Sequence, residues 1–302
     1  MKYKSRLESG KPVIFRGAAT ALITPFRDDT IDIDAFAAMI ERQIRGGISA
    51  LVICGTTGES PTLTHDETIT LISHAVSAAG GRVPVIAGVG SNDTAKSAAL
   101  AIESAYAGAD AVMAVTPYYN KTTDAGLTAH FYAIANASPV PVIVYNVPPR
   151  TSVPIPLRVY GELAKHENIV AVKEASGDTA LAASLLRDYG DSLAIYSGCD
   201  EITLPILALG GSGVISVVSN ILPEETEALC RDFFRGDLDS ARERQFYLLP
   251  LIKALFSRPN PIPVKAACAM LGWCGPELRL PLAPLDNAEG ERVRRVLEMY
   301  EL

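Results

Sequence analysis

Short apolar segments alternate with longer stretches in which apolar residues recur every three or four positions. Eight of the short segments are apolar on both faces, which is typical of strands in a buried parallel sheet. They are residues 18–24, 50–54, 85–88, 111–116, 142–146, 169–174, 193–198 and 213–216. The longer stretches between them predict helices, for example at 94–106 and 179–189.

One helix carries a clear start signal. Thr64 stands three residues before Glu67, which is the spacing of a capping box, and predicts a helix from there to about Ala79. After residue 235 the strand-like segments stop, and only helical patterns follow, at 237–256, 263–271 and 289–300.

A weak internal repeat favours a closed barrel. Residues 47–52 resemble residues 108–113, and residues 83–86 recur as residues 140–143. Eight strand-then-helix units fit a (β/α)8 TIM barrel better than an open doubly wound sheet. We therefore expect an α/β protein with a barrel over 1–235, of which 1–14 is an N-terminal extension, and a small all-helical C-terminal domain over 236–302.

Composition excludes several classes of protein. The 302 residues are 48% hydrophobic and 20% charged, which is enough apolar material for a full core. The net charge of −7 argues against a nucleic-acid or membrane surface. Glycines interrupt the longest apolar run, and no secretory signal is recognisable, so we expect a cytoplasmic protein without a membrane span.

Cysteine and histidine usage gives no metal or disulfide signature. The five cysteines include no C-x-x-C pair, and we expect them to be buried free thiols. The four histidines are scattered, and we expect helix-surface or capping roles rather than metal ligation; they are His65, His74, His130 and His166. The usual dinucleotide and P-loop glycine motifs are missing from the sequence.

Polar residues at the strand ends mark the candidate site, because a barrel of this kind carries its chemistry at the carboxyl ends of its strands. Lys173 follows the buried run 169–172. Such a lysine can simply extend to solvent or pair with Glu174. Held in a pocket with tyrosines and threonines, it can instead lose its proton and attack a carbonyl to form a Schiff base.

Three further strand ends carry matching chemistry. Thr56 and Thr57 lie between two glycines and suit either an ordinary turn or a small carboxylate. Tyr145 is either a core aromatic or a proton carrier one strand away from Lys173. Arg150 follows two prolines that stiffen its loop, so it is either a surface charge or a bidentate carboxylate ligand.

These motifs together resemble a known family. Gly-Thr-Thr-Gly-Glu at 55–59, Tyr-Asn-Val-Pro at 145–148 and Val-Lys-Glu at 172–174 are similar to the pyruvate-dependent class I aldolase, or N-acetylneuraminate lyase, family. That family includes dihydrodipicolinate synthases. The resemblance runs from about residue 15 to residue 302, and the order and spacing of the motifs are specific.

The resemblance implies roles for individual residues. Lys173 would form a Schiff base with pyruvate, and this covalent imine would take the place of a cofactor. Tyr145 would carry the proton, with Thr56 and Tyr119 completing a relay, and Tyr119 would reach in from a neighbouring subunit of a homotetramer built from two dimers. Further residues would hold or surround pyruvate: Thr57, Gly198 and the backbone of Ile215.

The second substrate depends on Arg150, which resembles the arginine with which the synthases of the family bind the carboxylate of aspartate semialdehyde. Residues 260–265 are also synthase-like. We therefore expect condensation of pyruvate with L-aspartate 4-semialdehyde, the first committed step of lysine biosynthesis. The alternatives are a retro-aldolase of N-acetylneuraminate or a 2-keto-3-deoxy sugar acid, and a barrel that binds a keto acid without turnover.

The family also suggests an allosteric cleft. Members that lysine inhibits bind two lysines between subunits, and a glutamate there usually attracts the cationic ligand, whereas this sequence carries Lys96. A like charge at that position predicts weak or absent inhibition by L-lysine. The matching positions are Ser60, Pro61, His65, Thr68, Asn92, Lys96 and Tyr118.

Overall fold

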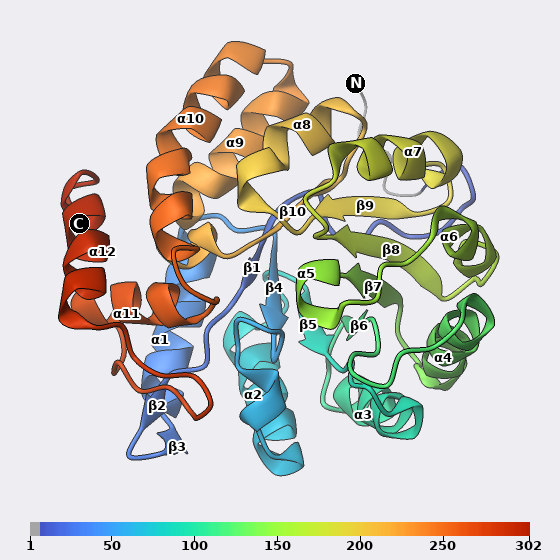
Figure 1. The fold of residues 1–302 in the computed structure, drawn as a ribbon, viewed down its shortest axis with the longest axis horizontal. Helices are drawn as coiled ribbons and strands as arrows, with labels where there is room; N and C mark the ends of the chain where they lie inside the picture. Colours follow the sequence, from blue (N-terminus) through green and yellow to red (C-terminus); the bar gives the residue numbers. More distant parts are fainter. Residues whose placement is uncertain (1–6) are drawn as a thin grey trace.

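The protein is an eight-stranded parallel barrel surrounded by helices, in a computed structural model that describes residues 7–302 (Figure 1). Each strand pairs with the next along the chain, and β10 pairs with β1 to close the barrel. The strands are β1 (Gly17–Ala21), β4 (Ala50–Ile53), β5 (Val85–Gly88), β6 (Ala111–Val115), β7 (Val142–Asn146), β8 (Ile169–Glu174), β9 (Ala194–Ser197) and β10 (Gly213–Ser216). The predicted (β/α)8 barrel is confirmed.

The strands alternate with helices that cover the outside of the barrel. These are α1 (Ile33–Arg45), α2 (His65–Ala79), α3 (Thr94–Tyr106), α4 (Asp124–Ala137), α6 (Leu157–Leu163), α7 (Thr179–Tyr189), α8 (Thr203–Ala208) and α9 (Pro223–Arg235). The capping box at the start of α2 is present, since the Thr64 hydroxyl accepts from the Glu67 backbone and the Glu67 carboxylate accepts from the Thr64 backbone.

Three helices follow α9, as the sequence predicts: α10 (Leu238–Leu255), α11 (Ile262–Met270) and α12 (Asn287–Glu298). The helix α10 packs along α9, and α11 and α12 pack against each other and against α10 (Figure 1). In the same view α11 lies below α10, on the side of the barrel that carries α1. The start of α11 therefore reaches the barrel mouth, where it contacts the site described below.

A small hairpin escaped the sequence analysis. Strands β2 (Phe26–Arg27) and β3 (Thr30–Ile31) pair through the turn Asp28–Asp29. Both turn residues have left-handed backbone angles, with φ of 51° and 59°. Aspartate tolerates a left-handed conformation, but the usual sequence signal of a two-residue hairpin turn includes a glycine. Because this turn contains none, the sequence pattern did not predict the hairpin.

The amino-terminal end of the barrel is plugged by the chain before β1. The ring of Phe15 stacks on that of Tyr196, with centroids 4.2 Å apart and an interplanar angle of 9°. The Lys11 ammonium donates to the carbonyls of Ala164 and Ile169, at 2.6 and 2.9 Å. Because this end is filled, the opposite end, where the strands terminate, is the open mouth of the barrel.

The structure tests the expectations that the cysteines are buried free thiols and that the histidines lie on helix surfaces or cap helices. The five cysteines are free thiols, three of them buried and two, Cys199 and Cys274, half-buried. His130 was expected on a helix surface, and that is wrong: it is buried in α4, where Thr94 lies 2.9 Å from its Nδ1, and burial lowers its pKa. Among the described residues, no helix is long and apolar enough to cross a membrane.

Candidate active site

Lys173 and Tyr145 face each other inside the barrel. Their strands pair in register, with Tyr145 opposite Lys173. The Lys173 Nζ lies 4.3 Å from the centroid of the Tyr145 ring, and the two residues are only 5% and 6% exposed. The lysine does not extend to solvent, and its amine lies in an apolar pocket next to a phenol, where it can act as a nucleophile.

Glu174 points away from the barrel interior, because successive side chains of a strand face opposite sides. Its carboxylate accepts from the Asn146 amide at 2.9 Å, from the Tyr160 hydroxyl at 3.0 Å and from the Ser176 backbone at 2.7 Å. Burial and this carboxylate raise the pKa of Tyr160. Among the described ion pairs none joins Lys173 to Glu174, so the carboxylate fixes the strand end rather than pairing with the lysine.

Gly198 leaves the space that the lysine side chain occupies. A Cβ at this position would lie 3.1 Å from the Lys173 Cε and 2.5 Å from the Ala175 Cβ. Ile215 is buried at the end of β10, next to the turn 217–218. The predicted pocket residues thus lie at the ends of three adjacent strands, β8, β9 and β10.

Asp200 is a site-supporting residue that the sequence analysis missed. It is 3% exposed, and its carboxylate accepts from the backbone of Val217 and Val218 at 2.9 and 3.1 Å. Burial raises its pKa, while these hydrogen bonds oppose the rise. The carboxylate thereby fixes the turn that follows Ile215. Nothing in the local sequence distinguishes Asp200 from a surface aspartate.

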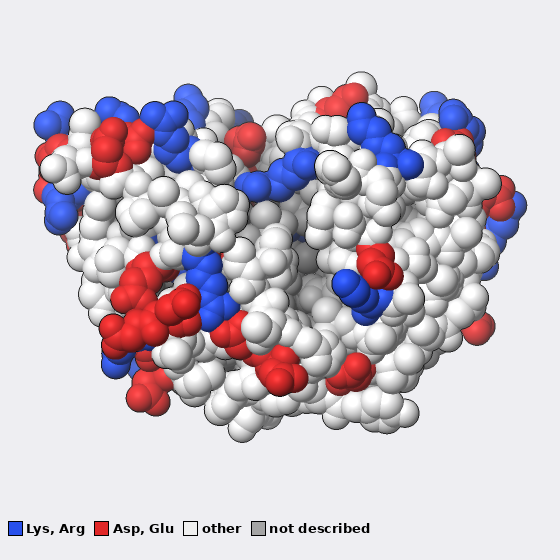
Figure 2. Space-filling model, turned by 60° about the horizontal axis from the view of Figure 1, so that its bottom comes forward, with Lys and Arg blue, Asp and Glu red and all other residues white. Residues whose placement is uncertain are grey.

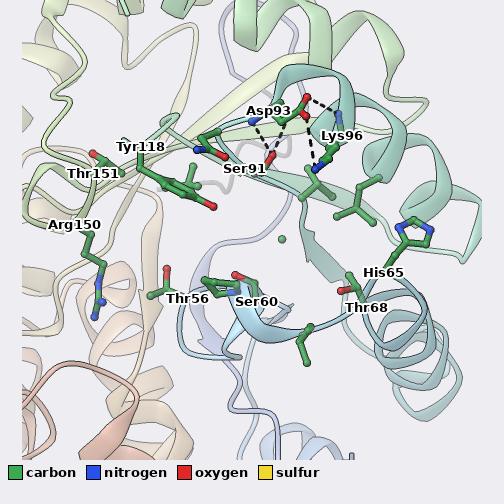
Figure 3. A pocket seen from close by; sticks show the side chains of 18 of the residues that line it. Thr56, Ser60, His65, Thr68, Ser91, Asp93, Lys96, Tyr118, Arg150 and Thr151 are labelled. Carbon is green, nitrogen blue, oxygen red and sulfur yellow. Dashed lines mark hydrogen bonds and ion pairs between the residues drawn. The ribbon is translucent and has the colours of Figure 1, made fainter. Parts of the chain in front are cut away.

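The threonine loop, residues 55–59, lies across the barrel mouth from Lys173. Thr57 is 3% exposed, and its hydroxyl accepts a hydrogen bond from the Asn260 amide at 2.9 Å. Thr56 faces an open cavity (Figure 3). The loop ends at Glu59, which forms a buried ion pair with Lys265 of α11 that sequence analysis also missed.

Arg150 lies on the same cavity wall as Thr56 (Figure 3). It belongs to α5 (Pro148–Thr151), a single helical turn that the two prolines begin. One guanidinium nitrogen donates to the Asn260 carbonyl at 3.0 Å, which anchors the side chain. A guanidinium carries five N–H donors, so the remaining ones are available to an incoming carboxylate.

The cavity has a volume of about 810 Å³ and joins the barrel mouth to the predicted allosteric cleft. Lys173 and Tyr145 lie deeper in the barrel and do not line it. All the predicted cleft residues do, namely Ser60, Pro61, His65, Thr68, Asn92, Lys96 and Tyr118. Figure 2 shows a hollowed face of the molecule, where Lys and Arg are scattered among Asp and Glu rather than gathered in one patch.

The charges of this cleft are partly neutralised. The Lys96 ammonium lies 3.9 Å from the Asp93 carboxylate, and its side chain is 81% exposed (Figure 3). The His65 Nε2 lies 2.6 Å from the Glu103 carboxylate. The cleft therefore presents an exposed ammonium group at the position where the sequence predicts like-charge repulsion of a cationic ligand.

Tyr119 is the one predicted catalytic residue that this chain does not bring into its own site. The residue is 90% exposed, has a left-handed φ of 68° and does not line the cavity. Its neighbour Tyr118 does line the cavity. Within residues 7–302, no group of three or more His, Cys, Asp or Glu side chains could hold a metal ion.

Comparison with known proteins places this geometry in context. The model of the dihydrodipicolinate synthetase family matches residues 14–300. A 4-hydroxy-tetrahydrodipicolinate synthase of Salinibacter ruber is 47% identical over 291 residues, 96% of each chain. The protein of that name from Thermoanaerobacter pseudethanolicus is 45% identical over 290 residues, 96% of this chain and 98% of the relative.

Solved structures agree with the sequence relatives. The crystal structure of dihydrodipicolinate synthase from Aquifex aeolicus has a TM-score of 0.93 and 43% identity, and the match covers 95% of this chain and 99% of that one. The dihydrodipicolinate synthase from Thermotoga maritima has a TM-score of 0.93 and 39% identity, over 96% of this chain and 99% of that one.

Proposed function

Because this chain belongs to the dihydrodipicolinate synthetase family, we propose that it is a lyase that condenses pyruvate with L-aspartate 4-semialdehyde to 4-hydroxy-tetrahydrodipicolinate, in lysine biosynthesis. The observation that carries the proposal is the buried Lys173 amine against Tyr145, with Arg150 on the wall of the adjoining cavity. A retro-aldolase of sugar acids is not favoured, because the relatives with 43–47% identity are named as synthases.

The first half of the reaction takes place on pyruvate. The Lys173 amine adds to the keto carbon, and loss of one water from the adduct leaves an imine. Tyr145, with Thr56, moves the protons that the carbonyl oxygen gains and the methyl group loses. Loss of that methyl proton gives an enamine: the electrons of the carbon–hydrogen bond form a carbon–carbon double bond, and the protonated imine nitrogen accepts the electron pair of the carbon–nitrogen double bond. Thr57 and the backbone at Ile215 hold the pyruvate carboxylate and carbonyl.

The second half uses Arg150. Its guanidinium binds the carboxylate of the semialdehyde, which brings the aldehyde carbon to the enamine. A carbon–carbon bond forms, and the aldehyde oxygen takes up a proton. The substrate amine then attacks the imine carbon and displaces Lys173, so the ring closes and the free enzyme returns. The reaction needs no cofactor beyond the covalent imine on Lys173.

Borohydride trapping tests the imine. Incubation with pyruvate and sodium borohydride should add one pyruvate-derived adduct, mapped by peptide mass spectrometry to Lys173. An adduct on another lysine, or none, would contradict the mechanism. Arg150→Leu should leave trapping intact and lower turnover with the semialdehyde. A loss of about 1.5–3 kcal/mol, roughly ten- to a hundredfold in kcat/KM, is expected for one charge-assisted contact.

We also propose a homotetramer of two dimers in the cytoplasm, in which each chain lends its Tyr119 to a neighbour. The exposure of Tyr119 outside the cavity of its own chain supports this exchange. A mixing experiment tests this assembly. The variants Tyr119→Phe and Lys173→Ala should each be nearly inactive. Refolded together they should regain part of the wild-type activity, because a mixed dimer holds one site with both native residues. If mixing restores nothing, Tyr119 does not act across a subunit boundary.

The cleft around Lys96 supports weak or absent inhibition by L-lysine. An inhibition titration should show no effect of lysine below the millimolar range. Lys96→Glu should gain sensitivity, because it replaces a like charge with a carboxylate that attracts the ligand. Strong inhibition of the wild type at sub-millimolar lysine would show that another acid receives the ligand.

A further inference from the structure

A fully buried ion pair connects the threonine loop to the far end of the chain. Glu59 ends the loop, and Lys265 lies in α11, 206 positions later. Both side chains are 0% exposed, and the Lys265 ammonium lies 4.1 Å from the centroid of the Phe26 ring. A buried pair adds little net stability, because desolvation of both charges offsets their attraction. The main effect of this ion pair is therefore on the position of the two segments that it joins.

The carboxylate of Glu59 is held on both oxygens. One oxygen forms the ion pair with the Lys265 ammonium, and the other accepts a hydrogen bond from the Arg279 backbone N–H at 3.1 Å. Glu59 itself has a left-handed φ of 58°, a conformation that a glutamate keeps only where its surroundings enforce it. The preceding residue, Gly58, is fixed as well, because its carbonyl accepts from the Thr24 hydroxyl at 2.7 Å.

A second link runs from the same segment to the same loop. Asn260, which is 6% exposed, donates its amide to the Thr57 hydroxyl at 2.9 Å. Its backbone carbonyl accepts from Arg150 at 3.0 Å. Residues 260–265 thus hold both Thr57 and Arg150, the residues assigned to the two substrates, although the segment is far from either in sequence.

We propose that Glu59 and Lys265 are positioning residues, whose ion pair fixes the threonine loop so that Thr56 and Thr57 face pyruvate on Lys173. The inference rests on the proposed function, since it assigns the loop to pyruvate chemistry. Neither charged side chain lines the cavity, so the pair acts only through the loop. Residues 260–265 of the C-terminal segment are by this argument part of the active site.

Removal of both charges together tests this role. The double variant Glu59→Gln/Lys265→Met keeps the side-chain volumes and leaves no unpaired charge, so it should fold with a Tm close to that of the wild type. Lys173 should still be trapped at saturating pyruvate. The KM for pyruvate should rise about tenfold and kcat fall about a hundredfold, because misplacement of a contact group by about 1 Å has effects of that size.

A matched control uses another pair that ties the C-terminal segment to the barrel. Arg244 of α10 donates to the Asp232 carboxylate of α9 at 2.6 Å, and neither residue contacts the threonine loop or its anchors. The double variant Asp232→Asn/Arg244→Met should keep wild-type KM and kcat. A folded Glu59→Gln/Lys265→Met enzyme with wild-type kinetics, or equal kinetic losses in both double variants, would overturn the proposal.

Two further measurements keep the test decisive. If the double variant does not fold, Asn260→Ala removes the donor to Thr57 and leaves the backbone carbonyl on Arg150. The KM for pyruvate should then rise while the KM for the semialdehyde stays constant, and an unchanged KM for pyruvate overturns the proposal. If the wild type does not condense the two substrates, the proposed function fails. The positioning role of the ion pair can then still be tested by the pyruvate concentration that half-saturates Lys173 trapping. This concentration should be higher in the double variant than in the wild type.

Discussion

A methyl group at Gly198 should slow the chemistry of Lys173 while leaving the barrel folded. The added Cβ would meet the Lys173 Cε at 3.1 Å and the Ala175 Cβ at 2.5 Å. Carbon atoms in contact prefer about 3.5–4.0 Å, so the lysine chain must move by several tenths of an ångström and Ala175 by more. Overpacking of this kind destabilises by about 1–3 kcal/mol.

The kinetic effect of Gly198→Ala should be measurable apart from the structural one. Since a misplacement of about 1 Å costs about a hundredfold, a shift of the Lys173 chain by several tenths of an ångström should slow imine formation about tenfold. Stopped-flow trapping with borohydride measures that rate directly, and thermal unfolding measures stability. Gly290→Ala is the matched control: its Cβ meets only the Met270 Cε at 3.6 Å, within a helix, so it should stabilise slightly and leave the rate unchanged. Wild-type imine formation in a folded Gly198→Ala enzyme would refute the reasoning.

Two other predictions concern buried polar groups. Burial raises the pKa of Glu227 to about 7, against hydrogen bonds from the Ala18 backbone and Ser49. Its protonated form is the stable one in the fold, so its contribution is complete below about pH 4.5 and is lost as the pH rises through 7, by at most about 3 kcal/mol. Glu227→Gln should therefore flatten the pH dependence of Tm between pH 5 and 8, and an unchanged slope would contradict the assignment. Tyr160→Phe removes a donor from the buried Glu174 carboxylate and should cost about 1–3 kcal/mol and slow Lys173 trapping. Tyr300→Phe, directly after α12, removes the hydrogen bond to the Tyr247 carbonyl and should cost similar stability without slowing trapping, and equal slowing in both would show a general loss of packing.

The fold and the centre of the site follow from local patterns. Eight doubly apolar segments separated by helical stretches have few arrangements other than a barrel, and the carboxyl ends of parallel strands meet at one edge. Lys173 and Tyr145 could therefore be placed together from their positions at two neighbouring strand ends. The helix limits were predictable for the same reason, since capping residues such as Thr64 act within a few positions.

The residues that hold the site were not predictable in this way, because their partners are distant in sequence. Glu59 and Lys265 each look like a solvated charge until the fold brings them together. One signal was available: Lys265 is the only charged residue of α11, within an otherwise apolar helix. Asp200 and Asn260 carried no comparable signal, since each becomes informative only through hydrogen bonds to another segment.

Tyr119 lies outside the cavity of its own chain, on a loop that hydrogen bonds hold in place. Its loop is fixed by the Lys121 backbone, which donates to the Tyr119 carbonyl at 3.0 Å, and by the Asn120 amide, which donates to the Asn92 carbonyl at 2.9 Å. A left-handed φ at a bulky residue costs about 1–3 kcal/mol and persists only where such contacts enforce it. The loop thus places an exposed phenol outside its own chain's cavity, next to Tyr118 on the cavity wall. This position is the one that the proposed exchange of Tyr119 between neighbouring chains requires, and it gives the mixing experiment with Tyr119→Phe and Lys173→Ala its structural basis.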